Sequence, residues 1–337
     1  MDKIFSEIKR IKKAIGLSEI FRLIISMIKK FFYDVPHFWF RIAHYNFRWE
    51  FANSYLFPIK LNKRIKNKRL ELNINFLKKK YWKFISDYKK KDIEIWRNDK
   101  KIRVLWWQWI EKAPDLVKIC VNNIKQHNCG YEIVFLDENN YGKYIKLPDY
   151  ILEKVKKWYI TITHLSDIIR MALLKEYGWI WIDATMFVNS DIFKKFNDIN
   201  LNTNNPDRFV AETWNFEKWC GFFIWWRTNR LFNFCYDFFM EYHKDYNQLI
   251  NYFLIDYAIY IAYQSFDDCK KDINDVNIKN SNLYNLTKKF NETYDENKWN
   301  KLMWNDFFKL TFKLKFNKYD KNWKITNYGK FLQLLNN

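Results

Sequence analysis

A carboxylate at the end of an apolar run is the clearest candidate for chemistry in this sequence. In YGWIWIDAT, the apolar residues Trp179 to Ile182 are followed directly by Asp183. An unpaired carboxylate buried there would cost several kcal/mol, so the folded chain must give Asp183 a partner or a use. Ligands of α/β sheets bind beyond the carboxyl ends of the strands, so a site is expected at Asp183.

A second pair of charged residues lies just upstream. Asp167 and Arg170 are three residues apart in THLSDIIRMALLKEYG (163–178), and this spacing puts them on one face of a predicted helix. A turn at Gly178 joins this helix to the run that ends at Asp183 and brings the pair toward the neighbouring strand. Taken alone, the spacing is typical of an intrahelical salt bridge worth about 0.3–0.5 kcal/mol. A substrate-binding pair is the alternative.

The elements that must position these residues alternate between strands and helices. IRVLWW (102–107) and YEIVFLD (131–137) are predicted strands, and the segment between them is a predicted helix over 113–128. Short links between strand, helix and strand predict a parallel pair with a right-handed crossover. The run ending at Asp183 supplies a third strand. The remaining predictions are strands at 209–213, 220–226 and 309–314, helices at 149–159, 229–243 and 248–264, and an irregular polar stretch at 267–300.

The segment SDIIRMALLKEYGWIWIDAT resembles the signature of sugar-transfer enzymes with a DxD motif. Glycosyltransferase family 32 and the capsular polysaccharide synthesis proteins read S-D-x-x-R and then Y-G-G-x-Y/W-x-D-x-D/T. The similarity covers about residues 102–315 and includes WCGFFIWWRTN, LINYFLIDYAIYIA and KLTFK. It implies a GT-A-like α/β domain with a mostly parallel central sheet, which transfers a sugar from a nucleotide-sugar donor.

The same resemblance implies a divalent cation. In such enzymes the DxD carboxylates bind Mn²⁺ or Mg²⁺, which bridges the donor diphosphate, so Asp183 and Thr185 are the expected ligands. Thr185 departs from the strict motif because a neutral hydroxyl replaces a carboxylate, so the metal affinity should fall. Cationic side chains are then expected to share diphosphate binding, and Lys309 and Lys313 of KLTFK are the candidates. Trp179 stands where the family pattern has its second glycine.

The resemblance also implies roles for other side chains. Asp183 is expected to be catalytic, and Asp167 and Arg170 are expected to bind and position the donor sugar. Trp106 or Trp107, at the end of the first predicted strand, is expected to stack on the nucleotide base. Alternation along the strand lets only one of the two face the site, and Trp107 is preferred. Packing in the core is the alternative for both.

Asp256 is a second catalytic candidate, because it lies among apolar residues of a predicted helix. A carboxylate there is either half of a core ion pair or an active-site group that orients hydroxyls. Glu212 and Glu217 follow a predicted strand and are secondary candidates for contact with metal or acceptor. His127 and His164 lack the spacing of metal ligands, so structural roles are expected for both.

Positive charge dominates the chain and is densest in residues 1–100. The 58 basic and 38 acidic residues give a net charge of +20, which implies an anionic partner. Within 3–32 apolar residues recur at helical spacing opposite lysines and arginines. This pattern fits a helix on an anionic membrane surface, and a helix pair packed on the catalytic domain is the equal alternative. A basic, largely helical region (1–100) and a GT-A-like domain (101–337) are predicted.

The sequence favours a cytoplasmic protein that is peripheral at the inner face of the membrane. No run approaches the roughly 18 apolar residues of a membrane span, and no secretory signal is recognisable at the start. The five cysteines are scattered and form no CxxC pair, which favours a reducing environment.

The leading interpretation is a hexosyltransferase-like enzyme of surface (capsular) polysaccharide synthesis that acts on a glycan or lipid-linked acceptor. The resemblance implies a retaining reaction. The alternative is a non-enzymatic basic protein that binds a membrane or nucleic acid, although no nucleic-acid motif is present and no such partner is expected. A phosphoryl-transfer enzyme or nuclease that uses Asp183 is disfavoured, because the chain lacks a Gly-rich phosphate loop and a carboxylate cluster.

Overall fold

The computed structural model describes residues 17–53, 62–93, 100–196, 201–203, 205–206, 219–226, 230–276, 279–280 and 282–335. The chain divides into two units. The first unit comprises Met1–Lys91 and Lys244–Ile261, and the second comprises Asp92–His243 and Ala262–Asn337. The first unit is therefore built from two separate stretches of sequence. The predicted helical pattern before residue 17 and the predicted strand 209–213 lie outside the described residues.

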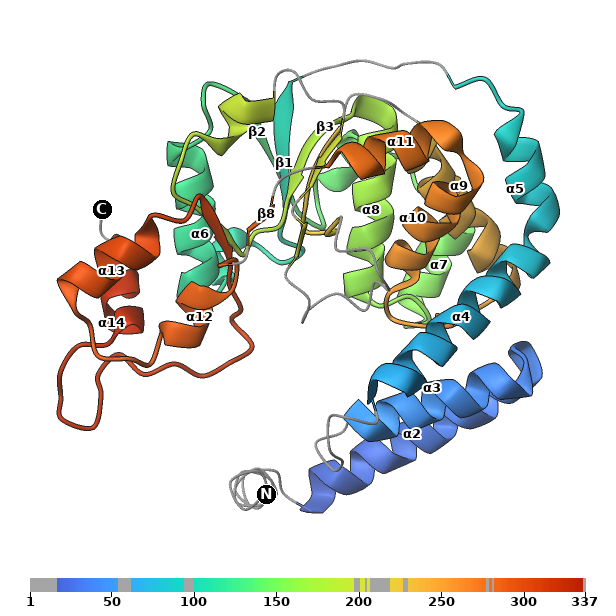
Figure 1. The fold of residues 1–337 in the computed structure, drawn as a ribbon, viewed down its shortest axis with the longest axis horizontal. Helices are drawn as coiled ribbons and strands as arrows, with labels where there is room; N and C mark the ends of the chain where they lie inside the picture. The colour runs from blue at the N-terminus through green and yellow to red at the C-terminus, as the bar shows by residue number, and fades with distance from the viewer. Residues whose placement is uncertain are drawn as a thin grey trace. The chain divides into compact units, whose positions relative to one another are not determined.

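Helices make up the described part of the first unit (Figure 1). They pack in sequence order, α2 on α3 and α3 on α4, around buried apolar side chains such as Ile42 and Leu77. No described helix has both the length and the apolar character that a membrane crossing requires. The helices are α2 (Leu17–His37), α3 (Phe40–Asn53), α4 (Asn62–Lys80), α5 (Trp82–Lys89) and the first part of α10 (Leu254–Ser265).

Buried polar contacts attach the second stretch of the first unit to its helices. The Asn46 amide donates to the carbonyl of Ile250 at 3.1 Å and to Asp34 at 3.2 Å. Asn73 donates to the Tyr257 hydroxyl at 3.1 Å. Because an unpaired buried amide is destabilising, these bonds favour one register of the two stretches.

A five-stranded sheet in the order β2-β1-β3-β7-β5 forms the centre of the second unit. β1 pairs in parallel with both β2 and β3, whereas β7 is antiparallel to β3 and to β5. Every strand except β7 therefore has the same direction, so the predicted mixed α/β fold with a mostly parallel sheet is confirmed. The strands are β1 (Lys101–Leu105), β2 (Glu132–Leu136), β3 (Trp179–Ile182), β5 (Leu201–Thr203) and β7 (Phe223–Trp226).

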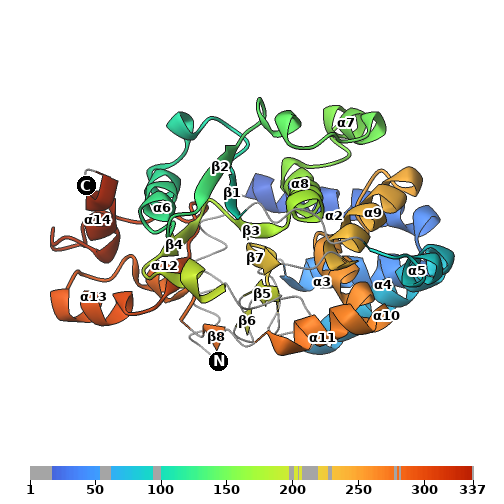
Figure 2. The ribbon, with the colours of Figure 1, turned by 90° about the horizontal axis from the view of Figure 1, so that it is seen from above.

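Two crossover helices cover opposite faces of this sheet. Figures 1 and 2 show α6 (Asp115–Gln126) on one side of the strands and α8 (Ile162–Tyr177) on the other. Side chains alternate along β3: Ile180 and Ile182 belong to the core that α6 contributes to, whereas Trp181 lies under Arg170 of α8. The alternation explains why an unbroken apolar run is suited to a strand that is buried on both faces.

The C-terminal segment packs on the second apolar face of α6. Leu116, Ile119 and Cys120 of this helix share a core with Phe290 and Phe331. The contributing elements are α12 (Asn285–Lys289), α13 (Glu296–Met303), α14 (Asn327–Leu332) and an antiparallel pair of β4 (Met186–Val188) with β9 (Phe307–Lys309). The pairing of β4 with β9 brings the end of β9 next to the residues that follow β3.

Two predictions for this region are wrong. The stretch 267–300 is not irregular, because it holds α11 (Asp267–Asp275), α12 and the start of α13. Its few apolar anchors, such as Leu286 and Phe290, are buried, but the many polar residues between them hide the helical period. The strand predicted over 309–314 ends at Lys309, because its partner β4 begins only at Met186.

Several shorter or peripheral elements complete the second unit. They are α7 (Asp149–Lys156), α9 (Arg230–Asp245), β6 (Asn205–Pro206), β8 (Lys279–Asn280), and the 3₁₀ turns η2 (Ile110–Lys112), η3 (Tyr141–Lys143), η4 (Ile192–Phe196) and η5 (Gln333–Leu335).

Candidate functional site

The turn between α8 and β3 uses two consecutive left-handed residues. Gly178 has φ 65° and ψ −149°, a conformation that is almost restricted to glycine. Trp179 follows with φ 68°. A positive φ suits the second glycine that the sugar-transferase resemblance implies at that position, and a tryptophan there carries strain of about 1–3 kcal/mol. Burial of its indole against Trp225, with ring centroids 5.6 Å apart, offsets part of that strain.

Asp183 lies at the carboxyl end of β3, where the sequence places a ligand site. Its backbone N–H donates to the carbonyl of Phe222 at 2.8 Å, and its carbonyl accepts from the N–H of Met186 at 3.0 Å. These bonds fix the backbone just beyond the sheet. The side chain keeps 27 % of its surface exposed, so the carboxylate is not enclosed in the core.

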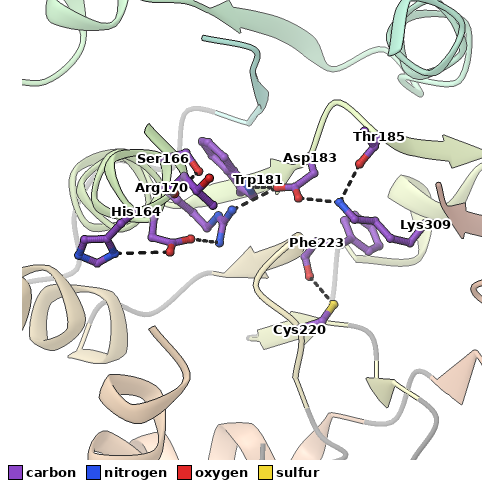
Figure 3. Close-up of polar contacts among 11 residues, drawn as sticks. His164, Ser166, Arg170, Trp181, Asp183, Thr185, Cys220, Phe223 and Lys309 are labelled. Carbon is purple, nitrogen blue, oxygen red and sulfur yellow. Dashed lines mark hydrogen bonds and ion pairs between the residues drawn. The ribbon is translucent and has the colours of Figure 1, made fainter. Parts of the chain in front are cut away.

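Three donors from different elements converge on this carboxylate (Figure 3). Oδ1 accepts from Arg170 Nη2 at 3.2 Å and from Trp181 Nε1 at 3.0 Å. Oδ2 accepts from Lys309 Nζ at 2.7 Å. Each oxygen of Asp183 is therefore paired with one cation.

Lys309 reaches the carboxylate from β9. Strand pairing sets it opposite Met186, and the next N–H, that of Leu310, donates to the carbonyl of Thr185 at 2.9 Å. The ammonium also donates to Thr185 Oγ1 at 2.8 Å and lies 4.9 Å from the ring centroid of Phe222. Lys309 Nζ thus bridges the two side chains that the sequence predicted as metal ligands.

Arg170 continues the network on the other side. Its side chain is only 7 % exposed, its Nη1 donates to Asp167 at 2.9 Å, and its guanidinium lies 4.9 Å from the ring centroid of Trp181. Asp167 Oδ2 is 3.6 Å from Nδ1 of the buried His164, whose Nε2 is 2.9 Å from Nε2 of His243. The predicted Asp167–Arg170 pair is therefore an intrahelical ion pair, and its arginine contacts Asp183 directly.

Opposing effects set the pKa of Asp183. Burial alone would raise it, but the charges of Lys309 and Arg170 and the hydrogen bonds from Lys309 and Trp181 outweigh burial and hold the pKa below its usual 3.8. Asp183 is therefore ionised at neutral pH and helps to fix the two cations.

This lowered pKa predicts a pH-dependent stability. A carboxyl whose pKa is lower in the folded state stabilises that state at pH values above its ordinary 3.8 and loses this contribution as the pH falls through the folded-state pKa. The free energy of unfolding of the natural protein should exceed that of Asp183→Asn at neutral pH, and the difference should shrink in acid. Urea unfolding of both proteins across this pH range measures it, and a difference independent of pH would contradict the lowered pKa.

The described residues around Asp183 do not form a divalent-metal site of the usual kind. Mg²⁺ and Mn²⁺ prefer about six oxygen ligands. Here one carboxylate and one hydroxyl point at the position, and a lysine ammonium bridges them. Among the described residues there is also no group of three or more His, Cys, Asp or Glu side chains that could hold a metal. Metal binding at Asp183 and Thr185 stays an untested prediction.

The remaining predicted residues are distributed around and away from this network. Trp106 and Trp107 follow β1 at the same sheet edge. Trp106 packs edge-on against Phe312, and Trp107 contacts Tyr141, with ring centroids 5.4 Å apart in each pair. Lys313 is exposed, and its backbone N–H donates to Thr311. Of the two predicted lysines, Lys309 therefore contacts Asp183, whereas Lys313 has no described contact with it.

Asp256 lies on α10 in the first unit, half-buried, whereas Asp183 belongs to the second unit. It is not one of the described contacts of Asp183, and its catalytic role stays a prediction. Glu212 and Glu217 lie outside the described residues. His164 is buried beside His243. His127, at the end of α6, forms a hydrogen bond through its ring Nδ1 with the side chain of Asn123.

Two contributors to the site were not predicted. Trp181 was predicted only as part of the apolar run, yet its indole N–H donates to Asp183. The signal was available, because residues two apart on a strand share a face. The carbonyl and ring of Phe222 hold the Asp183 backbone and the Lys309 ammonium. No local pattern distinguishes Phe222 from its aromatic neighbours, so sequence alone gave no signal for it.

A comparison with protein families shows which family this chain belongs to. The family model for the capsular polysaccharide synthesis protein matches residues 53–330. The chain belongs to the capsular polysaccharide synthesis protein family. A comparison with curated proteins gave no match.

The family match extends the predicted resemblance at both ends. It begins at residue 53 and so includes α4 and α5 of the first unit, not only the α/β unit with the Asp183 network. Membership in the capsular polysaccharide synthesis family indicates a role in capsule biosynthesis. Because the match continues to residue 330, it also includes β9, which carries Lys309.

Proposed function

We propose that this protein is a glycosyltransferase that transfers a sugar from a nucleotide-sugar donor to a glycan or lipid-linked acceptor in capsule synthesis. The observation that carries the proposal is the partly exposed carboxylate of Asp183, held between the cations of Arg170 and Lys309 at the carboxyl end of β3. A GT-A-like fold, a relation to glycosyltransferase family 32 and a retaining reaction are parts of the same proposal. Family membership supports it.

The geometry suits the charge changes of sugar transfer. The bond between the anomeric carbon and the donor phosphate oxygen breaks, and a bond from the acceptor hydroxyl oxygen to that carbon forms. The nucleoside diphosphate leaves with the bonding electron pair, and the hydroxyl proton passes to its phosphate oxygen. Negative charge on the leaving diphosphate grows in the transition state, and fixed cations at that position stabilise it without reorganisation.

Each side chain of the network has a distinct task in this proposal. Lys309 and Arg170 stabilise the diphosphate charge, and Asp183 holds both cations in place. Asp167 fixes the other edge of the Arg170 guanidinium and contacts the donor sugar. The exposed part of the Asp183 carboxylate accepts from a sugar hydroxyl.

The aromatic residues beyond β1 are proposed to receive the nucleotide base. Trp106 with Phe312 and Trp107 with Tyr141 form two aromatic pairs at the end of a strand that is parallel to β3. The flat ring of a nucleotide base can stack on the aromatic rings of either pair. Trp107 is the preferred partner.

A donor-hydrolysis assay tests the proposed activity. The purified chain is incubated with a panel of nucleotide sugars, with and without divalent cation, and release of nucleoside diphosphate is measured. Turnover of at least one donor, lost in Asp183→Ala, is expected. No turnover with any donor, together with no donor binding by calorimetry, would contradict the proposal.

We further propose that α2 docks the protein on an anionic membrane surface. Four exposed apolar residues, Phe21, Ile25, Ile28 and Phe32, recur every three or four positions and therefore share one face of α2; Phe21 and Phe32 are 66 % and 69 % exposed. The exposed Arg22 and other basic residues of α2 provide the complementary charge for acidic headgroups. This surface supports a peripheral location at the inner face of the membrane.

Replacing these four apolar residues by serine should abolish most membrane binding. Each buried aromatic or aliphatic side chain contributes about 1.5–3 kcal/mol, so vesicle binding should fall at least tenfold. Co-sedimentation with phosphatidylglycerol vesicles measures the change. The matched control is Trp82→Ser, a 66 % exposed aromatic on α5. Equal binding of the serine variant and the natural protein would contradict the docking role of α2.

A further inference from the structure

We propose that the ammonium of Lys309 takes the place of a divalent cation in this site, so that the donor diphosphate binds without metal. The inference rests on the proposed function, because it names how the same site holds the diphosphate. It follows from the position, the attachment and the charge of one side chain.

The position of Lys309 Nζ is the first observation. It lies 2.7 Å from Asp183 Oδ2 and 2.8 Å from Thr185 Oγ1, between the two side chains that a DxD-type motif would offer to a metal (Figure 3). An ammonium has three N–H donors and no acceptor. These two contacts use two of the donors, and no described residue accepts from the third, which can bind a phosphate oxygen.

The attachment of Lys309 is the second observation. Its backbone is paired with Met186 in the β4–β9 ladder, and the following N–H donates to the carbonyl of Thr185. The side chain is only 18 % exposed and lies against the ring of Phe222. Such a lysine loses little further conformational freedom when a diphosphate arrives, unlike a lysine on an open surface.

Charge is the third observation. Both oxygens of Asp183 already accept from cations, Oδ1 from Arg170 and Oδ2 from Lys309. A divalent cation between Asp183 and Thr185 would have to displace the ammonium, and it would then lie close to two positive side chains. With a hydroxyl as the second ligand, the site gives a metal less compensating negative charge than two carboxylates would. The neutral hydroxyl of Thr185 and the ammonium of Lys309 therefore give this position a charge that suits an anion without a metal.

Calorimetry of nucleoside diphosphate binding tests the inference. UDP, GDP, CDP and ADP are titrated into the full chain in excess EDTA and, separately, in millimolar Mn²⁺. We expect that at least one of them binds the natural protein with the same affinity in both conditions, within about twofold. Lys309→Met should bind that diphosphate about tenfold to a hundredfold more weakly in EDTA, because a charge-assisted hydrogen bond is lost.

Two further variants make the result specific. Removal of the ammonium frees the position between Asp183 and Thr185, so Mn²⁺ should restore part of the affinity of Lys309→Met while having no effect on the natural protein. Lys309→Arg keeps the charge and should retain binding in EDTA. Lys315→Met, which removes an exposed lysine of the segment after β9, is the matched control and should bind as the natural protein does.

The outcomes separate this inference from the proposed function. Binding to the natural protein only in the presence of Mn²⁺ would overturn the inference and leave the glycosyltransferase proposal standing. Unchanged affinity of Lys309→Met in EDTA would also overturn it. If no diphosphate binds in either condition, both proposals fail. Thermal unfolding followed by circular dichroism shows whether each variant is folded, and the comparison of EDTA with Mn²⁺ on the natural protein decides the question even if Lys309→Met does not fold.

Discussion

Replacing Asp183 with Asn should lower donor turnover about a hundredfold to a thousandfold while the chain stays folded. The carboxylate holds Arg170 through one oxygen and Lys309 through the other. An amide has no charge and turns an NH₂ donor toward one of the cations, so at least one of them loses its fixed position. Loss of a single preorganised charge-stabilising contact typically has an effect of this size. The measurement is the rate of nucleoside diphosphate release by Asp183→Asn and by the natural protein.

The control for this prediction is Asp191→Asn. Asp191 forms an exposed i,i+3 ion pair with Lys194, and exposed pairs contribute little to stability. Asp191→Asn makes the same substitution in the same unit, away from Asp183. Its turnover should stay within about twofold of that of the natural protein. Equal turnover of Asp183→Asn and Asp191→Asn would show that the chemistry does not use the end of β3.

Replacing Arg170 with Met should destabilise the second unit by about 3–5 kcal/mol. The guanidinium is 7 % exposed and neutralises Asp167 and Asp183 together, so its removal leaves two neighbouring carboxylates without their shared cation. The melting temperature should fall by on the order of 10 °C. Differential scanning calorimetry of the natural protein and the variant measures the shift.

The cause of that destabilisation can be separated from lost packing. Arg170→Met combined with Asp167→Asn removes one of the two carboxylates that have lost their shared cation and should recover part of the stability. A double variant no more stable than Arg170→Met at any pH would contradict an electrostatic origin and point to packing against Trp181 instead.

The central part of the fold was predictable because its signals are local. The helix 163–178 and the strand that follows it are joined by a single tight turn, so the pattern of that segment was enough to bring Asp167 and Arg170 toward Asp183. Strand–helix–strand order likewise predicted the parallel pairing of β1 with β2. The meaning of Trp179 was not predictable, because the left-handed backbone that explains the family's glycine is visible only in the structure.

Contacts that join distant parts of the sequence were harder to predict. Lys309 is 126 residues from Asp183 and reaches it only through the pairing of β4 with β9. The KLTFK block named Lys309 and Lys313 as candidates but gave no means of choosing, because the strand was expected to continue to residue 314. The segment 267–300 was misassigned for a related reason: its helices depend on a few anchors that pack on α6.

We propose that the carboxyl end of β3, with Asp183 between Arg170 and Lys309, holds the donor diphosphate. The most direct test is a crystal structure of the protein with a bound nucleoside diphosphate, solved from crystals grown without added metal. We expect a phosphate oxygen within hydrogen-bonding distance of Lys309 Nζ, next to Asp183. A diphosphate bound elsewhere, with the contacts of Lys309 to Asp183 and Thr185 unchanged and solvent alone beside them, would contradict it.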